Sequence, residues 1–241
     1  MKKNQAYLSI VIAAFNEEEN IKDLTIRIGK ALRSIHVPYE LVYVIAGTDK
    51  TLAIVKQLQK NMPQIRYHYS QQPGGLGNDF KKGFSMVSSN STYVLTMDAD
   101  LNHQPEEIIH FLEAMKRTNA DIVIGSREAK GAHATSIPAW KRFVSHIANM
   151  VFTVITFIRI KDKTSGYRLY KNEIIQKIAP KITSKNFEFL MEILLVAQRS
   201  KYHMVEIPIT FTYRIHGKSK MNLLKTGCGY LKLLLRYAGV F

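Results

Sequence analysis

The stretch TYVLTMDADLNHQP, residues 92–105, decides the fold. It begins with an apolar run of strand length and ends at Pro105, a residue that suits the first position of a helix. Between them, Asp98 and Asp100 place two carboxylates at the end of the strand, where parallel sheets bind ligands. Both can turn towards one Mg²⁺ or Mn²⁺, since these cations prefer oxygen ligands. The structural alternative is that Asp98 ends the strand and Asp100 caps the turn.

Apolar runs alternate with amphipathic helical stretches on both sides of this segment. The runs have strand length: Tyr7 to Ala14, Glu40 to Ala46, Ile65 to Ser70, Thr92 to Asp98 and Asp121 to Ser126. Helical periodicity occupies the intervals: Glu17 to Arg33, Thr51 to Lys60, Leu76 to Val87 and Pro105 to Arg117. This alternation predicts an α/β fold, a Rossmann-like and mostly parallel sheet flanked by helices. Further helices are expected over about 141–160 and 188–199, and a strand over Met204 to Tyr213.

The positive charge is concentrated in the second half of the chain. The 241 residues contain 34 Lys and Arg and 19 Asp and Glu, for a net charge of +15. Residues 1–129 contain 15 basic and 14 acidic side chains, whereas residues 130–241 contain 19 and 5. This excess predicts an anionic partner: nucleic acid, an anionic membrane surface or a phosphorylated substrate. The alternative is a solvated basic surface without a partner.

Composition excludes several classes of protein. A hydrophobic content of 46% is too high for a disordered chain, and the single cysteine, Cys228, excludes a disulfide framework. A nucleic-acid-binding protein is disfavoured because no groove-reading module is present and because Asp98 and Asp100 would repel phosphate without a bridging metal.

Seven motifs spread over nearly the whole chain resemble those of the polyprenyl-phosphate glycosyltransferases. They are FNEEENI at 15–21, GLG at 75–77, MDADLNHQPEEI at 97–108, IGSR at 124–127, TSGYRLY at 164–170, EIPITF at 206–211 and HGKSK at 216–220. Within that family the chain most resembles the dolichol-phosphate mannosyltransferases. The resemblance implies a GT-A fold and inverting transfer of a sugar, first of all mannose from GDP-mannose, to a polyprenyl or dolichyl phosphate. The alternatives are UDP-glucose or another donor, and a soluble hydroxyl acceptor.

The resemblance also implies roles for individual residues. Asp98, Asp100 and Arg127 would be catalytic, and Asp98, Asp100 and Asn102 would hold Mg²⁺ or Mn²⁺. Acceptor-phosphate binding would fall on Arg127, Lys141 and Ser145, with Arg142 as a substitute for Lys141. The residues expected to contact the donor are Ala14, Asn16, Glu17, Gly47, Asp98, Ala99, Asp100, Asn102, Arg214 and Lys220. The alternative is that Asn16 and Glu17 only start a helix and that some of these cations are ordinary surface residues.

The sequence departs from the family pattern after the second strand. Many relatives carry Asp-Asp-Gly-Ser-x-Asp-Gly-Thr there, with the early carboxylates near the base and ribose. The corresponding stretch here is IAGTDKT, residues 45–51, which lacks both early acids. The identity of the donor base therefore stays open, with guanosine preferred to uridine by resemblance alone.

The change of rhythm after Ser126 and the uneven charge divide the chain. We expect a catalytic domain over residues 1–222, with a nucleotide-sugar half (1–129) and an acceptor and membrane-facing half (130–222). Residues 223–241 would form an amphipathic tail. The stretch from Phe143 to Ile160 is too polar to be a confident membrane span. Its apolar face either packs into the core or lies in the surface of a bilayer. We therefore expect a peripheral protein on the cytoplasmic face of a membrane, held by anionic lipid or by a separate membrane-anchoring partner protein.

Overall fold

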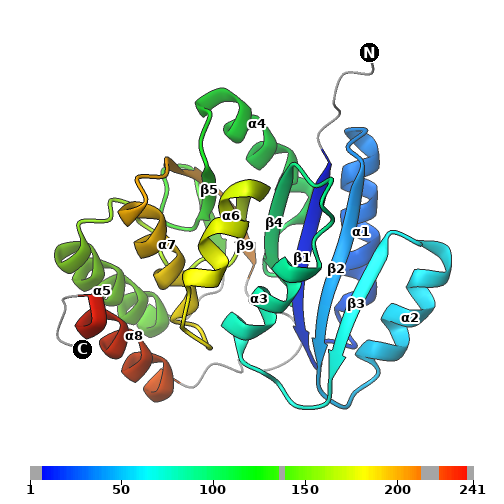
Figure 1. Ribbon diagram of the computed structural model, residues 1–241, viewed down its shortest axis with the longest axis horizontal. Coiled ribbons are helices and arrows are strands. Elements are labelled where there is room, and N and C mark those ends of the chain that lie inside the picture. The colour runs from blue at the N-terminus through cyan, green and yellow to red at the C-terminus, as the bar shows by residue number, and fades with distance from the viewer. Residues whose placement is uncertain (1–6, 136–138, 213–222, 238–241) are drawn as a thin grey trace.

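A seven-stranded mixed sheet forms the centre of the protein (Figure 1), as seen in a computed structural model that describes residues 7–135, 139–212 and 223–237. The strand order is β3-β2-β1-β4-β7-β5-β8. The strands are β1 (Leu8–Phe15), β2 (Tyr39–Ala46), β3 (Ile65–Ser70), β4 (Tyr93–Asp98), β5 (Ile122–Ser126), β7 (Arg168–Lys171) and β8 (Met204–Pro208). Only β7 runs antiparallel to its neighbours, β4 and β5. The predicted mostly parallel α/β sheet is confirmed.

Helices cover both faces of the sheet. One core cluster lies beneath α1 (Ile21–Ser34), α2 (Thr51–Asn61) and α4 (Ile108–Thr118), which follows the short 3₁₀ helix η1 (Pro105–Glu107). The other lies beneath α3 (Leu76–Met86), α6 (Asn172–Ile178) and α7 (Phe189–Arg199), with the 3₁₀ helix η2 (Ala179–Lys181) after α6. Central strands such as β2 are therefore buried on both sides, as is usual for parallel sheets. Because helices cover both faces of the sheet, we expect a ligand to bind at the carboxyl ends of the parallel strands.

Two further helices lie at the end of the molecule opposite α2 (Figure 1). They are α5 (Ala139–Thr156) and α8 (Leu223–Tyr237). Phe152 of α5 and Leu233 of α8 are buried in the second core cluster, so each helix packs one face against the domain. In the described part of the chain, no helix is long and apolar enough to cross a membrane.

Three details of the sequence prediction were wrong. Helix α1 begins at Ile21 rather than at Glu17, because the intervening residues bind the loop after β2. The strand expected over 204–213 is divided: β8 pairs with β5, and β9 (Thr210–Thr212) pairs with β6 (His133–Thr135). Pro208 ends β8, since proline donates no hydrogen bond to a strand ladder. The antiparallel strand β7 and the helix α6 were not predicted.

Candidate active site

The two carboxylates of the sequence prediction follow the end of β4. Asp98 is the last residue of the strand, and Leu101, two residues after Ala99, has a φ of +59°. A bulky side chain rarely adopts this left-handed conformation, which costs about 1–3 kcal/mol and is typical of functional turns. Asn102 stabilises the turn, because its backbone N–H and its Nδ2 donate to the two Asp100 carboxylate oxygens, at 3.2 and 2.8 Å.

Two buried polar atoms beside this turn have no hydrogen-bond partner among the described residues. They are Oδ1 of Asn102 and Nδ1 of His103. His103 stacks on Tyr167, and its Nδ1 lies 3.9 Å from Oδ2 of Asp98. Burial lowers the pKa of His103 to about 4, so the imidazole is neutral at pH 7. A neutral ring nitrogen and an amide oxygen are both able to accept a hydrogen bond or coordinate a cation.

A divalent cation would need ligands beyond the acidic side chains of this site. Within residues 7–135, 139–212 and 223–237, no three His, Cys, Asp or Glu side chains gather in a metal-binding arrangement. The unsatisfied Oδ1 of Asn102 nevertheless fits a hard cation, which prefers oxygen ligands and commonly shares itself with substrate phosphates. The residues present therefore fit a cation whose remaining coordination sites are filled by the phosphates of a ligand.

The loops after β1 and β2 are joined to each other by hydrogen bonds. Oδ1 of Asn16 accepts from the backbone N–H of Thr48 at 3.0 Å, and Oε2 of Glu18 accepts from the N–H of Lys50 at 2.8 Å. Gly47 has a φ of +109°, and a Cβ at this position would lie 1.9 Å from Asn16 Oδ1. Asn16 and Gly47 therefore fix the shape of this edge of the sheet. Of the other expected donor-binding residues here, Ala14 is buried within β1, and Glu17 follows Asn16.

Arg127, which follows β5, is held by an acid that the sequence analysis did not single out. Its Nε donates to Oδ2 of Asp162 at 2.7 Å, and its Nη2 donates to Oδ1 of Asp162 and to Oγ1 of Thr164. Burial alone would lower the pKa of Arg127, but the Asp162 carboxylate raises it above the usual value. Burial alone would raise the pKa of Asp162, but the charge of Arg127 and its hydrogen bonds lower it to about 2. Both groups are therefore charged at neutral pH.

The segment that carries Asp162 continues past the DADLN turn. Gly166 faces Asp98 so closely that an added Cβ would lie 3.3 Å from Oδ1, and its carbonyl accepts from Oγ1 of Thr96. The buried guanidinium of Arg168 holds the segment by donating to the carbonyls of Lys163, Ser165 and Leu190. Arg127 and Asp98 thus lie beside the same segment, residues 162–168. The TSGYRLY motif at 164–170 indicated this segment in the sequence.

The other expected acceptor and donor residues lie on α5 or outside the described residues. Lys141 and Ser145 lie in the first two turns of α5. Arg214 and Lys220 lie outside the described residues. The structure therefore brings Asp98, Asp100, Asn102 and Arg127 to the strand ends and leaves the remaining acceptor and donor contacts as predictions.

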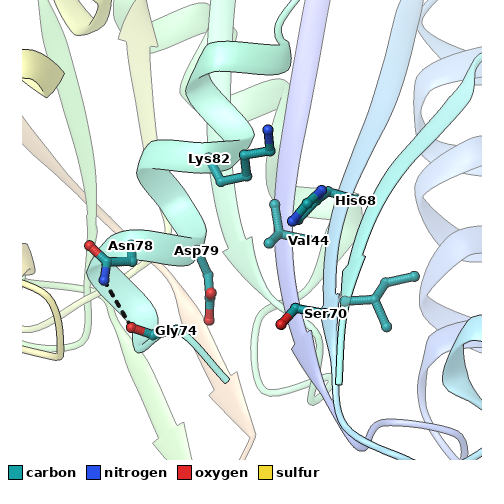
Figure 2. A pocket seen from close by; sticks show the side chains of 8 residues that line it. Val44, His68, Ser70, Gly74, Asn78, Asp79 and Lys82 are labelled. Carbon is teal, nitrogen blue, oxygen red and sulfur yellow. Dashed lines mark hydrogen bonds between the residues drawn. The ribbon is translucent and has the colours of Figure 1, made fainter. Parts of the chain in front are cut away.

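A cavity of about 250 Å³ opens between α3 and the edge strand β3 (Figure 2). Ser70 of β3 and Asp79 of α3 lie on its opposite walls. Burial raises the pKa of Asp79 to about 6, an effect that the hydrogen bond from the Gly74 backbone only partly offsets. Asp79 lies two residues after the GLG motif, and no pattern in the sequence identified it.

Solved structures share this architecture over nearly the whole chain. Glucosyl-3-phosphoglycerate synthase from Mycobacterium tuberculosis, in complex with Mn²⁺, UDP and phosphoglyceric acid, superposes with a TM-score of 0.68 at 16% identity, over 97% of this chain and 79% of that one. The same enzyme with Mg²⁺ and UDP gives a TM-score of 0.66 at 15% identity, over 97% and 80%. The fold is therefore the GT-A fold.

The sequence assigns the chain to a family. Residues 9–179 match Glycosyl transferase family 2, and the chain belongs to this family. It is 34% identical over 232 residues to the dolichol-phosphate mannosyltransferase of Pyrococcus furiosus, which covers 95% of this chain and 63% of that protein. It is 33% identical over 217 residues to the polyprenol monophosphomannose synthase of Mycolicibacterium smegmatis, over 88% and 80%. The chain thus spans less than two thirds of the length of the Pyrococcus enzyme.

Proposed function

We propose that this protein transfers a sugar, mannose from GDP-mannose in the first instance, to a polyprenyl or dolichyl phosphate at the cytoplasmic face of a membrane. The observation that carries the proposal is the juxtaposition of two sites for anionic groups at the strand ends. One is the Asp98–Asn102 turn, where a cation would bind the donor diphosphate, and the other is Arg127, where a lipid phosphate would bind. The two mannosyl-transferring relatives support this choice of acceptor and sugar.

For this reaction the protein must align the donor with the acceptor phosphate and neutralise the negative charge of both. An oxygen of the acceptor phosphate forms a bond to the anomeric carbon of the sugar, while the bond from that carbon to the β-phosphate oxygen breaks. The nucleoside diphosphate leaves with the electron pair, and a single in-line displacement inverts the anomeric centre. Since the attacking phosphate is already an anion, no general base is needed. Holding the two reactants in line lowers the barrier, because it makes a bimolecular step effectively unimolecular.

The state of Asp162 favours a phosphate acceptor over a hydroxyl acceptor. A hydroxyl acceptor would need a carboxylate base beside the sugar. Asp162, the acid paired with Arg127, has a pKa lowered to about 2, which makes it a weak base. Its role is instead to hold the Arg127 guanidinium, whose remaining donor capacity suits a phosphate oxygen.

Mg²⁺ or Mn²⁺ would be held by Asp98, Asp100 and Oδ1 of Asn102. When bound, the cation would neutralise charge on the departing diphosphate. This chain's own contribution is the turn geometry, in which Asn102 orients the Asp100 carboxylate through two hydrogen bonds. A paramagnetic resonance titration with Mn²⁺ tests this independently of activity. Asp100→Asn should abolish binding, whereas Asp23→Asn, an exposed acid on α1, should leave it unchanged.

Helix α5 supports a location on the membrane surface. The exposed side chains of this helix include Ile147, Met150, Val151, Val154 and Ile155, the last four within two turns. The interpretation of this face as core is therefore wrong for these five residues, although Ile158, just after the helix, is buried. An exposed apolar stripe on a helix of a basic half suits the interface of an anionic bilayer.

The activity test offers the purified protein Mg²⁺ or Mn²⁺, a panel of radiolabelled nucleotide sugars, and polyprenyl phosphate in protein-free vesicles. We expect a labelled, mild-acid-labile lipid with GDP-mannose, without any added membrane-anchoring partner protein. Glu173→Gln, at an exposed site on α6, serves as the matched control for Asp100→Asn. Glycosylation of a soluble acceptor, with no lipid product from any donor, would refute the proposal.

A further inference from the structure

The cavity between α3 and β3 lies on the side of the site away from the acceptor. In the strand order, β4 carries the Asp98–Asn102 turn, β5 carries Arg127 two strands away, and β2 and β3 lie on the opposite side. The sugar must sit between the diphosphate and the acceptor phosphate, because the new bond forms there. The nucleoside part of the donor must therefore extend the other way, over β1 towards β2 and β3.

The dimensions agree with this direction. Neighbouring strands lie about 4.8 Å apart, so β2 and β3 are roughly 10–14 Å from β4. This is the span that a nucleoside needs beyond its diphosphate. The cavity measures about 250 Å³, which is less than the roughly 300–1,000 Å³ of pockets that enclose a drug-sized ligand. It is therefore suited to one ring system and not to a whole nucleotide sugar.

The end of β2 has no polar side chain to recognise a base. Ile45 and Ala46 are apolar and are 1% and 3% exposed. The polar groups that line the cavity come from α3 and β3: Asp79, Asn78, Lys82, Ser70 and His68. In Figure 2, Asn78 turns back to donate to the carbonyl of Gly74, whereas the carboxyl group of Asp79 faces the cavity.

We propose that Asp79 is the specificity-determining residue for the donor base, and that its carboxylate accepts two hydrogen bonds from adjacent N–H groups on the edge of a guanine ring. This inference rests on the proposed function, since it assumes a nucleoside diphosphate donor at the Asp98–Asn102 turn. Guanine offers the N1 proton and the N2 amino group side by side, which suits the two oxygens of a carboxylate. Uracil offers a single N–H between two carbonyl oxygens, so it leaves one carboxylate oxygen unpaired.

The protonation state of Asp79 is compatible with this role. Its pKa of about 6 leaves the group ionised, and therefore able to accept, at pH 7.5. Lys82 and His68 line the same cavity. A bidentate pair of this kind typically discriminates between bases by about one to two orders of magnitude in affinity.

Calorimetric titration of the full chain with GDP, IDP and UDP, in the presence of Mg²⁺ and without lipid, tests the inference. We expect GDP to bind at least tenfold more tightly than UDP, with IDP weaker than GDP because it lacks the N2 amino group. Asp79→Asn should weaken GDP binding at least tenfold and change UDP binding less. Asp79→Ser provides a second variant, circular dichroism verifies that both are folded, and Glu173→Gln is the matched control.

The outcomes separate this inference from the proposed function. Equal GDP affinity in the wild-type protein and in a folded Asp79 variant would overturn the role of Asp79, as would equal wild-type affinities for GDP and UDP. Failure of the wild-type protein to bind any of the three nucleotides would instead overturn the proposed function.

Discussion

Arg127 and Asp162 form a bidentate ion pair that joins the end of β5 to the segment before β7. The two charge-assisted bonds measure 2.7 and 2.8 Å, and the backbone N–H of Arg127 also donates to Asp162 at 3.0 Å. The carboxylate is fully buried, and the guanidinium lies over the ring of Phe211 at 5.2 Å. A single acid therefore fixes the position and compensates the charge of the arginine that we assign to the acceptor phosphate.

Asp162→Asn should lower the free energy of unfolding by about 3 kcal/mol, because breaking one partner of a buried pair leaves the other charge uncompensated. Urea denaturation measures the change. Glu173→Gln, which removes an exposed i,i+4 pair with Lys177, should change it by less than about 0.5 kcal/mol. In the folded fraction, the KM for polyprenyl phosphate should rise more than the KM for the donor. An unchanged stability would mean that the pair does not hold Arg127.

Gly47→Ala should disrupt the edge of the sheet that Asn16 and the β2 loop form together. The new Cβ would overlap Oδ1 of Asn16, and a φ of +109° is strained for any residue with a side chain. We expect a loss of roughly 2 kcal/mol of stability and weaker donor binding, both measurable on the purified variant. Gly227→Ala is the matched control: nothing lies within 4 Å of its added Cβ. Because Gly227 is inside α8, this variant should gain about 0.5–1 kcal/mol.

The sequence was sufficient to predict the parallel part of the sheet, because each strand is a buried apolar run whose ends are marked by polar loops. It was also sufficient to place Asp98, Asp100 and Arg127, since Asp98 ends such a run and the other two come shortly after one. Asp162 could not be identified in this way. It belongs to a segment without regular periodicity, and its importance arises from burial beside Arg127, 35 residues earlier in the chain.

The same reasoning explains the misplaced start of α1. Glu17 and Glu18 have the charge that suits a helix N-terminus, yet the backbone N–H of Glu17 donates to Oγ1 of Thr51, and the Glu18 carboxylate accepts from Lys50. These tertiary contacts outweigh the local preference and delay the helix to Ile21. Asp79 was missed for a similar reason, because only the packing of α3 beside β3 makes its carboxyl group part of a cavity.

Asp79 should give the stability of the protein a measurable pH dependence. Its pKa is raised from a usual value of about 4 to about 6, so the folded state binds the proton more tightly than the unfolded state. Stability contributed by this group is therefore present at pH 4 and is lost as the pH rises through 6, with no further change above. Asp79→Asn should remove this loss.

The measurement is a series of urea denaturations between pH 4 and pH 8. The stability of Asp79→Asn relative to the wild-type protein should increase from pH 4 through pH 6 and level off at about pH 7, where the carboxyl group of the folded protein is ionised. Repeating the comparison in a His68→Gln background removes the imidazole that lines the same cavity. A difference that is independent of pH would show that burial does not raise the pKa of Asp79.

The exposed apolar face of α5 should determine binding to membranes. Met150 and Val154 lie one helical turn apart and are 53% and 68% exposed, and Phe157, just beyond the helix, is 80% exposed. Since these side chains are already in water, Met150→Asp and Val154→Asp should leave the fold intact. They should weaken binding to vesicles that contain anionic lipid, because a carboxylate resists entry into the interface and is repelled by the surface charge.

Flotation with vesicles of neutral and anionic lipid, at low and high salt, separates the apolar and electrostatic contributions to this binding. The wild-type protein should bind anionic vesicles more tightly, and less so as the salt concentration rises, because salt screens the attraction. Ile26→Asp is the matched control: Ile26 is an exposed apolar residue of α1, on the other side of the molecule from α5 (Figure 1). If Ile26→Asp weakened binding as much as Val154→Asp does, α5 would not be the membrane-facing surface. Loss confined to the α5 variants would instead identify α5 as the membrane-facing surface. The segment that follows α5 carries Asp162, the partner of Arg127, so a lipid phosphate would then approach Arg127 from this side.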